Sequence, residues 1–444
     1  MKTKNLTIEN AWICTIVENE IIPFFGDIII SDGKISKIRP KYFHIYLKNP
    51  DKVNKDSFNA YGRVVTIPLV NFHDHIYSRL AKGLPLKGKF DNFQNVLKNL
   101  WWKLDRVLDM EMIIASAQMA AIESIRDGVT YIFDHHSSQN EIAGSLKTIK
   151  NILNDFKLRG VLCFESTDRN GLDNALKGLS ENKEFYSFQM NEDFHAMLGL
   201  HASFTLSDDL LLESKMLMKS DWGVHIHVAE DVSDNRLSVE YTGSLPVSRL
   251  KKFKLMNDKS ILVHGVHLKE RDFYNISEAE SAIAFCLDSN MNNSVGVPNF
   301  SKIPKSIPLL AGTDGMHSNI SRSLKQMFLT FRDQGISGDQ ATALIKKIYF
   351  DQIGFAKKYF PDFATLNEKD RADLIIWDYV PPTPLTKENF WGHFIFGMLE
   401  YPIQSVVQHG NFLMKEFQLI GVDENKIKNE IYIQGERLVK KISI

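Results

Sequence analysis

Cysteine is scarce in this chain, and its scarcity excludes two kinds of architecture. The three cysteines, Cys14, Cys163 and Cys286, are spread over 444 residues. An odd number of distant cysteines fits neither a disulfide framework nor a cysteine-based zinc site, and it is typical of a reducing compartment. The first residues also lack the apolar core of a secretory signal, so we expect a cytoplasmic protein.

An excess of one charge and long apolar runs are missing as well. Lys and Arg total 53 while Asp and Glu total 54, so no net field favours nucleic acid or an anionic membrane surface. No apolar stretch reaches the roughly 18 residues that a membrane-spanning helix needs. Because 44% of the residues are hydrophobic, the chain can bury a large core. We therefore expect a globular protein that binds a small molecule, with no nucleic acid and no membrane as partner.

What the chain does contain is an apolar run, residues 65–72, that leads into His73 and His75. Alternate residues of a strand point to the same side, so two imidazoles at a strand end share one space. This spacing predicts a metal site, although two solvated histidines on an exposed strand are an equally ordinary interpretation.

Beyond residue 64, short apolar runs alternate with longer helical stretches, which is the pattern of parallel strands joined by crossover helices. We expect eight such strands, which end near His73, Asp134 to His136, Glu165, His201, His227, His264, Asp288 and Asp314. Eight β/α units predict an α/β fold with a TIM (β/α)8 barrel over residues 65–367. In that fold the active site forms at the carboxyl ends of the strands.

The two ends of the chain have a different pattern, with short strands joined by turns. Asp32-Gly33 and His409-Gly410 mark the clearest hairpins. We expect residues 1–64 and 368–444 to form one small β domain that is split between the termini.

Several strand ends carry side chains that suit a metal site. His227 is followed by Glu230, and His264 and Asp314 end later runs. Any one of them could be a half-buried polar residue, but four such endings after the histidine pair are hard to attribute to chance. The set His73, His75, His227 and Asp314 would suit one divalent ion, zinc or alternatively iron, with a position left open for water.

The order of these residues resembles the amidohydrolase superfamily, in particular its cytosine deaminase and chlorohydrolase-like branch. Segments such as Leu100-Trp-Trp-Lys-Leu-Asp-Arg106 and Phe390-Trp-Gly-His393 are most similar to the SsnA-like aminohydrolases. The resemblance implies a metal-bearing barrel beside a β-sandwich made from both termini, and a homodimer. It also implies a single metal ion, because the strand that ends at His201 lacks the lysine that bridges two ions in other members.

Two segments depart from the pattern of that branch. Pro68-Leu69-Val70-Asn71 lacks the usual glycine after the proline, and the usual His-Asn-Pro-x-Ser-Asn after strand seven keeps only Ser289 and Asn290. In relatives this second turn lies beside the pocket, so its change leaves the substrate open.

The candidate residues predict hydrolytic deamination by a metal-bound hydroxide. Asp314 would take the proton from water, His264 would position the hydroxide, and Glu230 would carry a proton to a nitrogen of the substrate. The hydroxide would add to an sp2 carbon of an amino-substituted heterocycle or guanidine-like molecule, and ammonia would leave.

Three further residues are candidates for substrate binding, namely His201, His136 and Glu165. Adjacent side chains on a strand point to opposite sides, and of the pair His135 and His136 we expect His136 to line the pocket. Two alternatives stay open: hydrolysis of a cyclic amide or another C–N or C–X bond at the same site, and a barrel that binds metal and ligand without turnover. Fold alone decides neither, because barrels host many chemistries.

Overall fold

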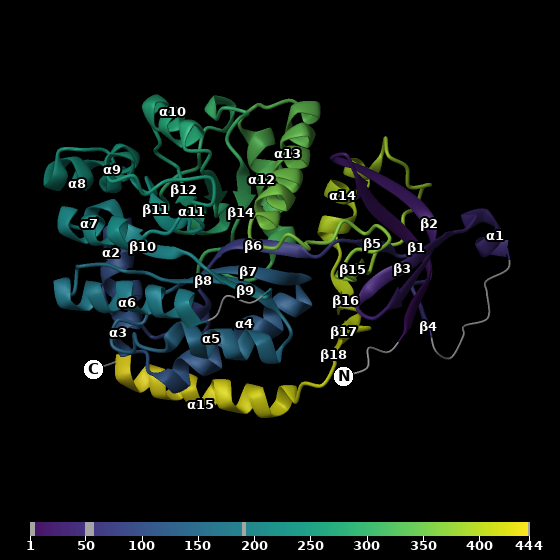
Figure 1. Ribbon diagram of the computed structural model, residues 1–444, viewed down its shortest axis with the longest axis horizontal. Coiled ribbons are helices and arrows are strands. Elements are labelled where there is room, and N and C mark those ends of the chain that lie inside the picture. Colours follow the sequence, from purple (N-terminus) through teal and green to yellow (C-terminus); the bar gives the residue numbers. More distant parts are fainter. Residues whose placement is uncertain (1–4, 49–56, 189–191, 443–444) are drawn as a thin grey trace.

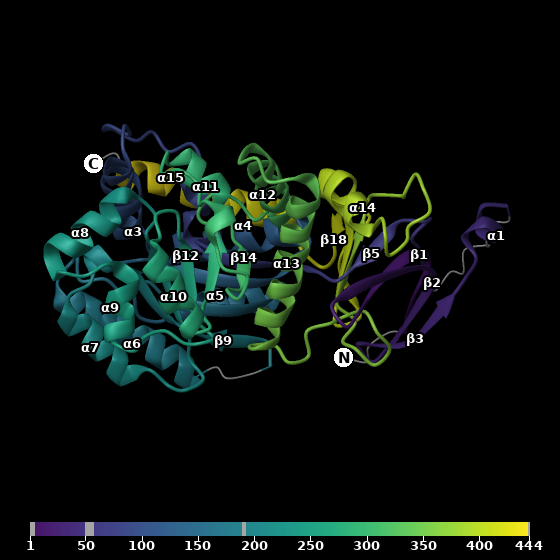
Figure 2. The ribbon, with the colours of Figure 1, turned by 90° about the horizontal axis from the view of Figure 1, so that it is seen from above.

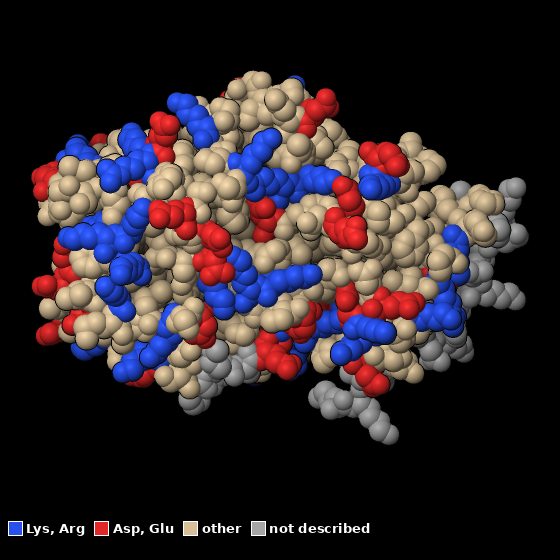
Figure 3. All heavy atoms as spheres, turned by 45° about the horizontal axis from the view of Figure 1, so that its top comes forward, with Lys and Arg blue, Asp and Glu red and all other residues tan. Residues whose placement is uncertain are grey.

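The computed structural model describes residues 5–48, 57–188 and 192–442. Strands from both ends of the chain lie together on one side of the molecule, and parallel strands surrounded by helices lie on the other (Figure 1). Among the described residues, no helix combines the length and the apolar character needed to cross a bilayer. On the face drawn in Figure 3, basic and acidic side chains are intermixed, in line with the balanced charge of the sequence.

A sheet of nine strands unites the two ends of the chain, in the order β18-β17-β16-β15-β5-β1-β2-β3 with β4 beside β1. Its strands are β1 (Leu6–Val17), β2 (Glu20–Ser31), β3 (Lys34–Pro40), β4 (Ser57–Asn59), β5 (Val64–Thr66), β15 (Leu374–Trp377), β16 (Ile403–Gln408), β17 (Asn411–Lys415) and β18 (Gln418–Leu419). Both predicted hairpins are present, β2 to β3 through Asp32-Gly33 and β16 to β17 through His409-Gly410. All four turn residues have positive φ, as tight hairpin turns require.

The parallel strands form two sheets. One contains β6 (Leu69–Asp74), β7 (Val129–His136), β8 (Arg159–Phe164) and β9 (Phe194–Ala196). The other contains β10 (Leu198–Ala202), β11 (Val224–Val228), β12 (Ile261–His264), β13 (Ala282–Phe285) and β14 (Leu309–Ala311). Nearly every residue of these strands is buried, which is expected of parallel strands covered on both faces.

Single parallel bridges connect the two sheets at both ends. Asp74 pairs with Asp314, and Ser166 pairs with Leu200. At the second junction a Cβ on Gly199 would lie 2.2 Å from the carbonyl oxygen of Phe164. Only glycine allows the backbones to approach so closely there.

Helices cover the outer faces of the parallel strands (Figures 1 and 2). The longer ones are α4 (Met110–Arg126), α5 (Ser145–Asp155), α6 (Leu172–Phe188), α7 (Asp208–Leu217), α8 (Val232–Thr242), α10 (Glu270–Glu278), α12 (Ile320–Asp333), α13 (Gly338–Lys357) and α15 (Glu424–Ile442). The chain also has shorter helices, not all of which cover those strands: α1 (Phe43–Lys48), η1 (Ile76–Ala81), α2 (Phe93–Val96), η2 (Leu97–Trp101), α3 (Trp102–Val107), η3 (Ser203–Thr205), α9 (Pro246–Lys252), α11 (Leu287–Asn292), η4 (Phe300–Lys302), α14 (Phe390–Phe396) and η5 (Met398–Glu400). Of these, α1 lies at the far end of the sheet of terminal strands (Figure 1).

Two expectations need correction. The seventh parallel strand, β13, ends at Phe285, so the prediction that it ends near Asp288 is wrong. Asp288 lies in α11, and its carboxylate pairs with Arg322 at 3.1 Å and with His317 at 3.3 Å. The last part of the predicted β domain is instead a helix, α15, which packs against α4 at the outer surface rather than joining the sheet of the terminal strands (Figure 1).

Candidate metal centre and active site

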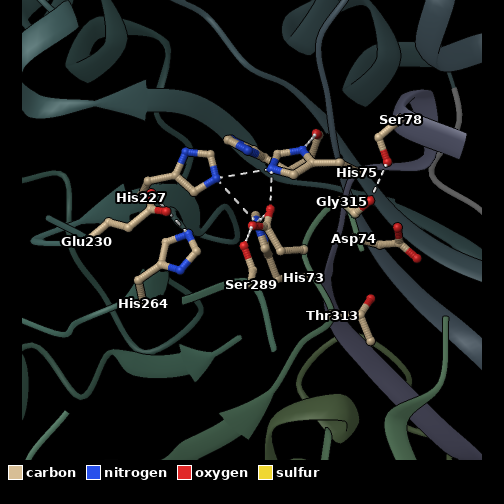
Figure 4. A network of polar contacts seen from close by, with 12 residues as sticks. His73, Asp74, His75, Ser78, His227, Glu230, His264, Ser289, Thr313 and Gly315 are labelled. Atoms are coloured by element: carbon tan, nitrogen blue, oxygen red, sulfur yellow. Dashed lines mark hydrogen bonds and ion pairs between the residues drawn. The ribbon is translucent and has the colours of Figure 1, made fainter. Parts of the chain in front are cut away.

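His73 and His75, at the end of β6, lie beside His227 at the carboxyl ends of the parallel strands (Figure 4). Asp314, which follows β14, lies against the same pair. Asp314 Oδ1 lies 2.9 Å from His75 Nε2 and 3.4 Å from His73 Nε2. His227 Nε2 lies 3.2 Å from His75 Nε2 and 3.3 Å from His73 Nε2. All four side chains are buried. Strands of both parallel sheets therefore bring the four predicted ligands together.

The outer nitrogens of these histidines show which ring nitrogen holds the proton. His75 Nδ1 lies 2.6 Å from the carbonyl oxygen of His135, and His227 Nδ1 lies 3.1 Å from that of His201. A carbonyl oxygen only accepts, so each Nδ1 is a donor, and Nε2 is the nitrogen that each ring turns toward the cluster. The two Nε2 atoms lie 3.2 Å apart, and once both are deprotonated a single cation could bind both.

The spacing of the four side chains agrees with such a cation. Zinc bonds of about 2.0–2.2 Å to nitrogen and oxygen place ligand atoms that share one ion roughly 3 Å apart. The separations given above, from 2.9 to 3.4 Å, are close to that value. His73 is held from behind, because its Nδ1 lies 2.9 Å from His225 Nε2, a contact of the kind that orients metal-binding imidazoles. The residues present thus fit a divalent metal ion.

The predicted catalytic residues His264 and Glu230 lie next to this cluster. Glu230 Oε2 is 3.4 Å from His264 Nε2 (Figure 4). Burial raises the pKa of Glu230 well above its usual value, and the charge of Asp314 raises it further. Burial also lowers the pKa of His264. Burial therefore favours the neutral form of both groups.

Two of these residues have unusual backbone conformations. The φ angles of His264 and Asp314 are 72° and 55°, in the left-handed region that non-glycine residues seldom adopt. Such conformations persist where the surrounding structure imposes them, and they cluster at active sites.

The segment around α11 contacts all three predicted catalytic residues. Ser289 donates to Asp314, and Asn290 Oδ1 lies 2.8 Å from His264 Nδ1. Asn293 hydrogen-bonds the Glu230 side chain. The departure from the usual motif in this segment therefore leaves Ser289 and Asn290 in contact with the site.

Two of the predicted substrate-binding residues line the same cavity. The Glu165 carboxylate is 3.6 Å from His135 Nδ1, 3.8 Å from His201 Nε2 and 3.7 Å from Arg169 Nη1, all longer than a hydrogen bond. Burial raises the pKa of Glu165 to about 7. The residues around the cavity are His75, Tyr77, Phe93, Leu97, Trp101, Trp102, Asp105, Glu165, Arg169, His201, Ala202, Phe204, His227, Glu230, Asp234, His264, Asn293 and Asp314.

The third predicted substrate-binding residue, His136, does not reach this cavity. Its Nε2 lies 2.9 Å from Ser138 Oγ, and its ring packs behind Tyr77 at 5.7 Å between centroids. His135 points inward instead, with its ring 4.8 Å from those of His225 and His227. The alternation along β7 was predicted correctly, but the inward side was assigned to the wrong residue.

Parallel strands here bring three imidazole nitrogens and a carboxylate together beside a buried glutamate, an arrangement typical of metal-dependent hydrolases. The comparison with known families gives the assignment: residues 64–413 match the model of the amidohydrolase family, so the chain belongs to that family. The predicted family is therefore confirmed, and the chain is an enzyme that hydrolyses carbon–nitrogen bonds.

Curated relatives and a solved structure agree with this assignment. The chain is 24% identical over 414 residues to 5'-deoxyadenosine deaminase of Methanocaldococcus jannaschii, covering 90% of this chain and 94% of that protein. It is 26% identical over 435 residues to 5-methylthioadenosine/S-adenosylhomocysteine deaminase of Pyrococcus horikoshii, covering 91% and 94%. The crystal structure of an adenosine deaminase from Xanthomonas campestris with bound zinc superposes with a TM-score of 0.81 at 18% identity, covering 98% of each chain.

Proposed function

We propose that this protein is a metal-dependent aminohydrolase that releases ammonia from an amino-substituted heterocycle. The observation that carries the proposal is the convergence of three imidazole Nε2 atoms on Asp314, with the buried carboxyl of Glu230 beside them. The relatives, whose names give deaminases of adenine nucleosides, support the same reaction type.

A closed barrel would explain why ligands from both sheets meet. We propose that the two parallel sheets form one TIM (β/α)8 barrel in which β9 and β10 act as a single bent strand. The bridges Asp74–Asp314 and Ser166–Leu200, at the two junctions between the sheets, support this closure. The corresponding domain division, residues 65–367 against residues 1–64 with 368–444, is supported by the sheet that unites both termini.

A single zinc ion is the metal that we propose, held by His73, His75, His227 and Asp314. The donor set of three imidazole nitrogens and one carboxylate supports zinc, and iron is the alternative. When bound, the ion would lower the pKa of a water molecule and make a nucleophilic oxygen available at neutral pH.

The roles of the surrounding residues follow from their contacts. Asp314 faces the histidines with Oδ1 and accepts the Ser289 hydroxyl at Oδ2, so Oδ1 is held where a proton from water would be taken. Glu230 holds a proton and can give it to a ring nitrogen. His264, with Nδ1 engaged by Asn290, presents Nε2 to the same space and orients the attacking water.

The test combines metal analysis with a search for ammonia release on the same preparation. We expect about one zinc or iron ion per chain and ammonia from at least one amino-heterocycle. Two metal ions per chain would overturn the ligand assignment. Metal without ammonia from any compound would favour a hydrolase of another C–N or C–X bond, or a binding protein without turnover.

A further inference from the structure

An apolar cluster lies at the mouth of the cavity, and most of its members line the cavity wall. This cluster is here called the cap. Its buried members are Phe93, Leu97 and Val295, and its partly buried members are Trp101, Trp102, Phe204 and Val266. Its residues come from segments that follow β6, β10, β12 and α11, so it ties together loops from several sides of the mouth. The Trp101 ring packs directly against Gly315, since a Cβ on Gly315 would lie 2.8 Å from that ring.

A buried ion pair closes one wall beneath the cap. The Arg169 guanidinium pairs with the Asp105 carboxylate, and the two side chains are only 8% and 2% exposed. The guanidinium also lies 5.1 Å from the centroid of the Trp102 ring. Because a buried carboxylate without its partner is costly, this wall resists opening more than a solvated loop would.

Inside the wall, His201 offers a hydrogen-bond acceptor. The Thr205 hydroxyl donates to the carbonyl oxygen of Ala202 at 3.0 Å, so its oxygen accepts from His201 Nδ1 at 2.6 Å. The proton of His201 is therefore on Nδ1, and Nε2 holds a lone pair.

Glu165 supplies the second acceptor. Its Oε1 lies 3.8 Å from His201 Nε2. When Glu165 is ionised it accepts, as His201 Nε2 does, so the two do not bond each other, but one N–H2 or ring N–H edge could donate to both.

From these contacts we infer that the site takes a free amino-heterocycle rather than a nucleoside, with Glu165 and His201 accepting hydrogen bonds from N–H groups of the ring. A ribosyl group would have to pass the cap or displace the Arg169–Asp105 pair. This inference rests on the proposed function, and it separates this chain from the relatives whose names give nucleoside substrates.

Matched pairs of compounds test the inference directly: adenine with adenosine, guanine with guanosine, and cytosine with cytidine. For any pair that releases ammonia, we expect kcat/KM of the base to exceed that of the nucleoside by at least about 100-fold. The wall beside the cavity leaves no room for the sugar, and a compound that leaves Glu165 and His201 without a hydrogen-bond donor binds poorly. Nucleosides turned over as well as their bases would overturn the inference while leaving the deaminase proposal intact. No ammonia from any of the six would count against the deaminase proposal itself.

Variants then test the cap and the acceptors separately. Trp102→Ala, and Trp102→Leu should the first fold poorly, are expected to reduce the preference for the base at least tenfold by opening the wall. Glu165→Gln should lower kcat/KM for the base by about 10- to 100-fold, as expected for a lost hydrogen bond to a charged group.

The matched control is Phe396→Ala, which removes an aromatic ring that is 64% exposed on α14, outside the cavity. It should leave the ratio of base to nucleoside unchanged. Metal content and circular dichroism establish that each variant is folded. A Trp102→Ala protein that folds and keeps the original ratio would show that the cap does not select the substrate. A Glu165→Gln protein with normal kcat/KM would exclude the acceptor role.

Discussion

Asn290 Oδ1 lies 2.8 Å from His264 Nδ1, and this contact determines which ring nitrogen of His264 faces the cavity. An amide oxygen only accepts, so Nδ1 carries the proton and Nε2, 3.4 Å from Glu230, is left as an acceptor. A histidine in this state can receive a proton from water or from Glu230. Asn290 thus prepares His264 for the role that the sequence predicts for it.

Asn290→Ala should leave His264 free to rotate and to exchange its ring proton. We expect kcat to fall about 10- to 100-fold, the usual effect of losing a partner that orients an active-site imidazole. KM and metal content should change little, because Asn290 contacts no predicted ligand. Steady-state kinetics with elemental analysis measure all three. Met291→Ala, an exposed neighbour on the same helix, is the control and should behave like the parent.

Asn290→Asp keeps an acceptor at the same position but adds a negative charge. A carboxylate favours the protonated imidazole, so the pKa of His264 should rise. If His264 acts when neutral, the acidic limb of the kcat profile moves to higher pH. An unchanged profile would argue that His264 does not titrate in the reaction.

Ser289→Ala tests the support of the proposed metal ligand Asp314. The Ser289 hydroxyl donates to Oδ2 of Asp314, which keeps Oδ1 turned toward the histidines. Losing such a partner typically costs about 10- to 100-fold in metal affinity. Competition with a chromogenic chelator should show this weakening, and kcat should recover at saturating metal. Ser306→Ala, on the surface, serves as control; equal affinities of the two variants would exclude the support role.

The sequence predicted the parts of the site that depend on strand order. The carboxyl ends of parallel strands meet at one edge, so His73, His227 and Asp314 could be placed together without knowledge of any loop. Strand seven was extended too far because α11 begins almost at once, at Leu287. The apolar residues of strand seven can be recognised in the sequence, but the residue at which the strand ends cannot.

Contacts made by loops could not be predicted in the same way. Arg169 pairs with Asp105 across 64 positions, and this pairing depends on where helix α3 lies relative to the turn that contains Arg169, which no local pattern specifies. The choice between His135 and His136 failed for a related reason. Alternation shows that one of them faces inward, but only the twist and register of β7 decide which. Ile427, Ile431 and Leu438 recur at helical spacing, and this stripe is the sequence signal for α15.

His227→Ala and Glu230→Gln separate metal binding from turnover. Removing His227 deletes one of three converging nitrogen donors, so metal content should fall from about one ion per chain to near zero, together with activity. Glu230→Gln keeps shape and ligands but cannot deliver a proton, so metal should stay while kcat falls about 10²- to 10⁴-fold. Elemental analysis measures the metal content and ammonia release measures the activity, both on the same preparation of each variant. A metal-loaded Glu230→Gln enzyme with normal rates would disprove the proton-transfer role.

Gly199→Ala tests whether the two parallel sheets close on each other at β8 and β10. Ser166 N donates to Gly199 O at 3.1 Å at this junction, and a Cβ on Gly199 would stand 2.2 Å from the Phe164 oxygen. The backbones must separate to admit a methyl group, and overpacking of this kind typically costs about 1–3 kcal/mol, occasionally more. Urea unfolding should therefore show a lower midpoint than the parent.

The control for this substitution is Gly354→Ala, in the exposed part of α13, where a Cβ meets nothing within 4 Å. Alanine there should stabilise the helix by up to about 1 kcal/mol, so the two variants should move the midpoint in opposite directions. If Gly199→Ala were as stable as the parent, the close approach of the strands would not exist and barrel closure would lose its support at this junction. Loss of stability with metal binding retained would locate the damage at the junction rather than at the site.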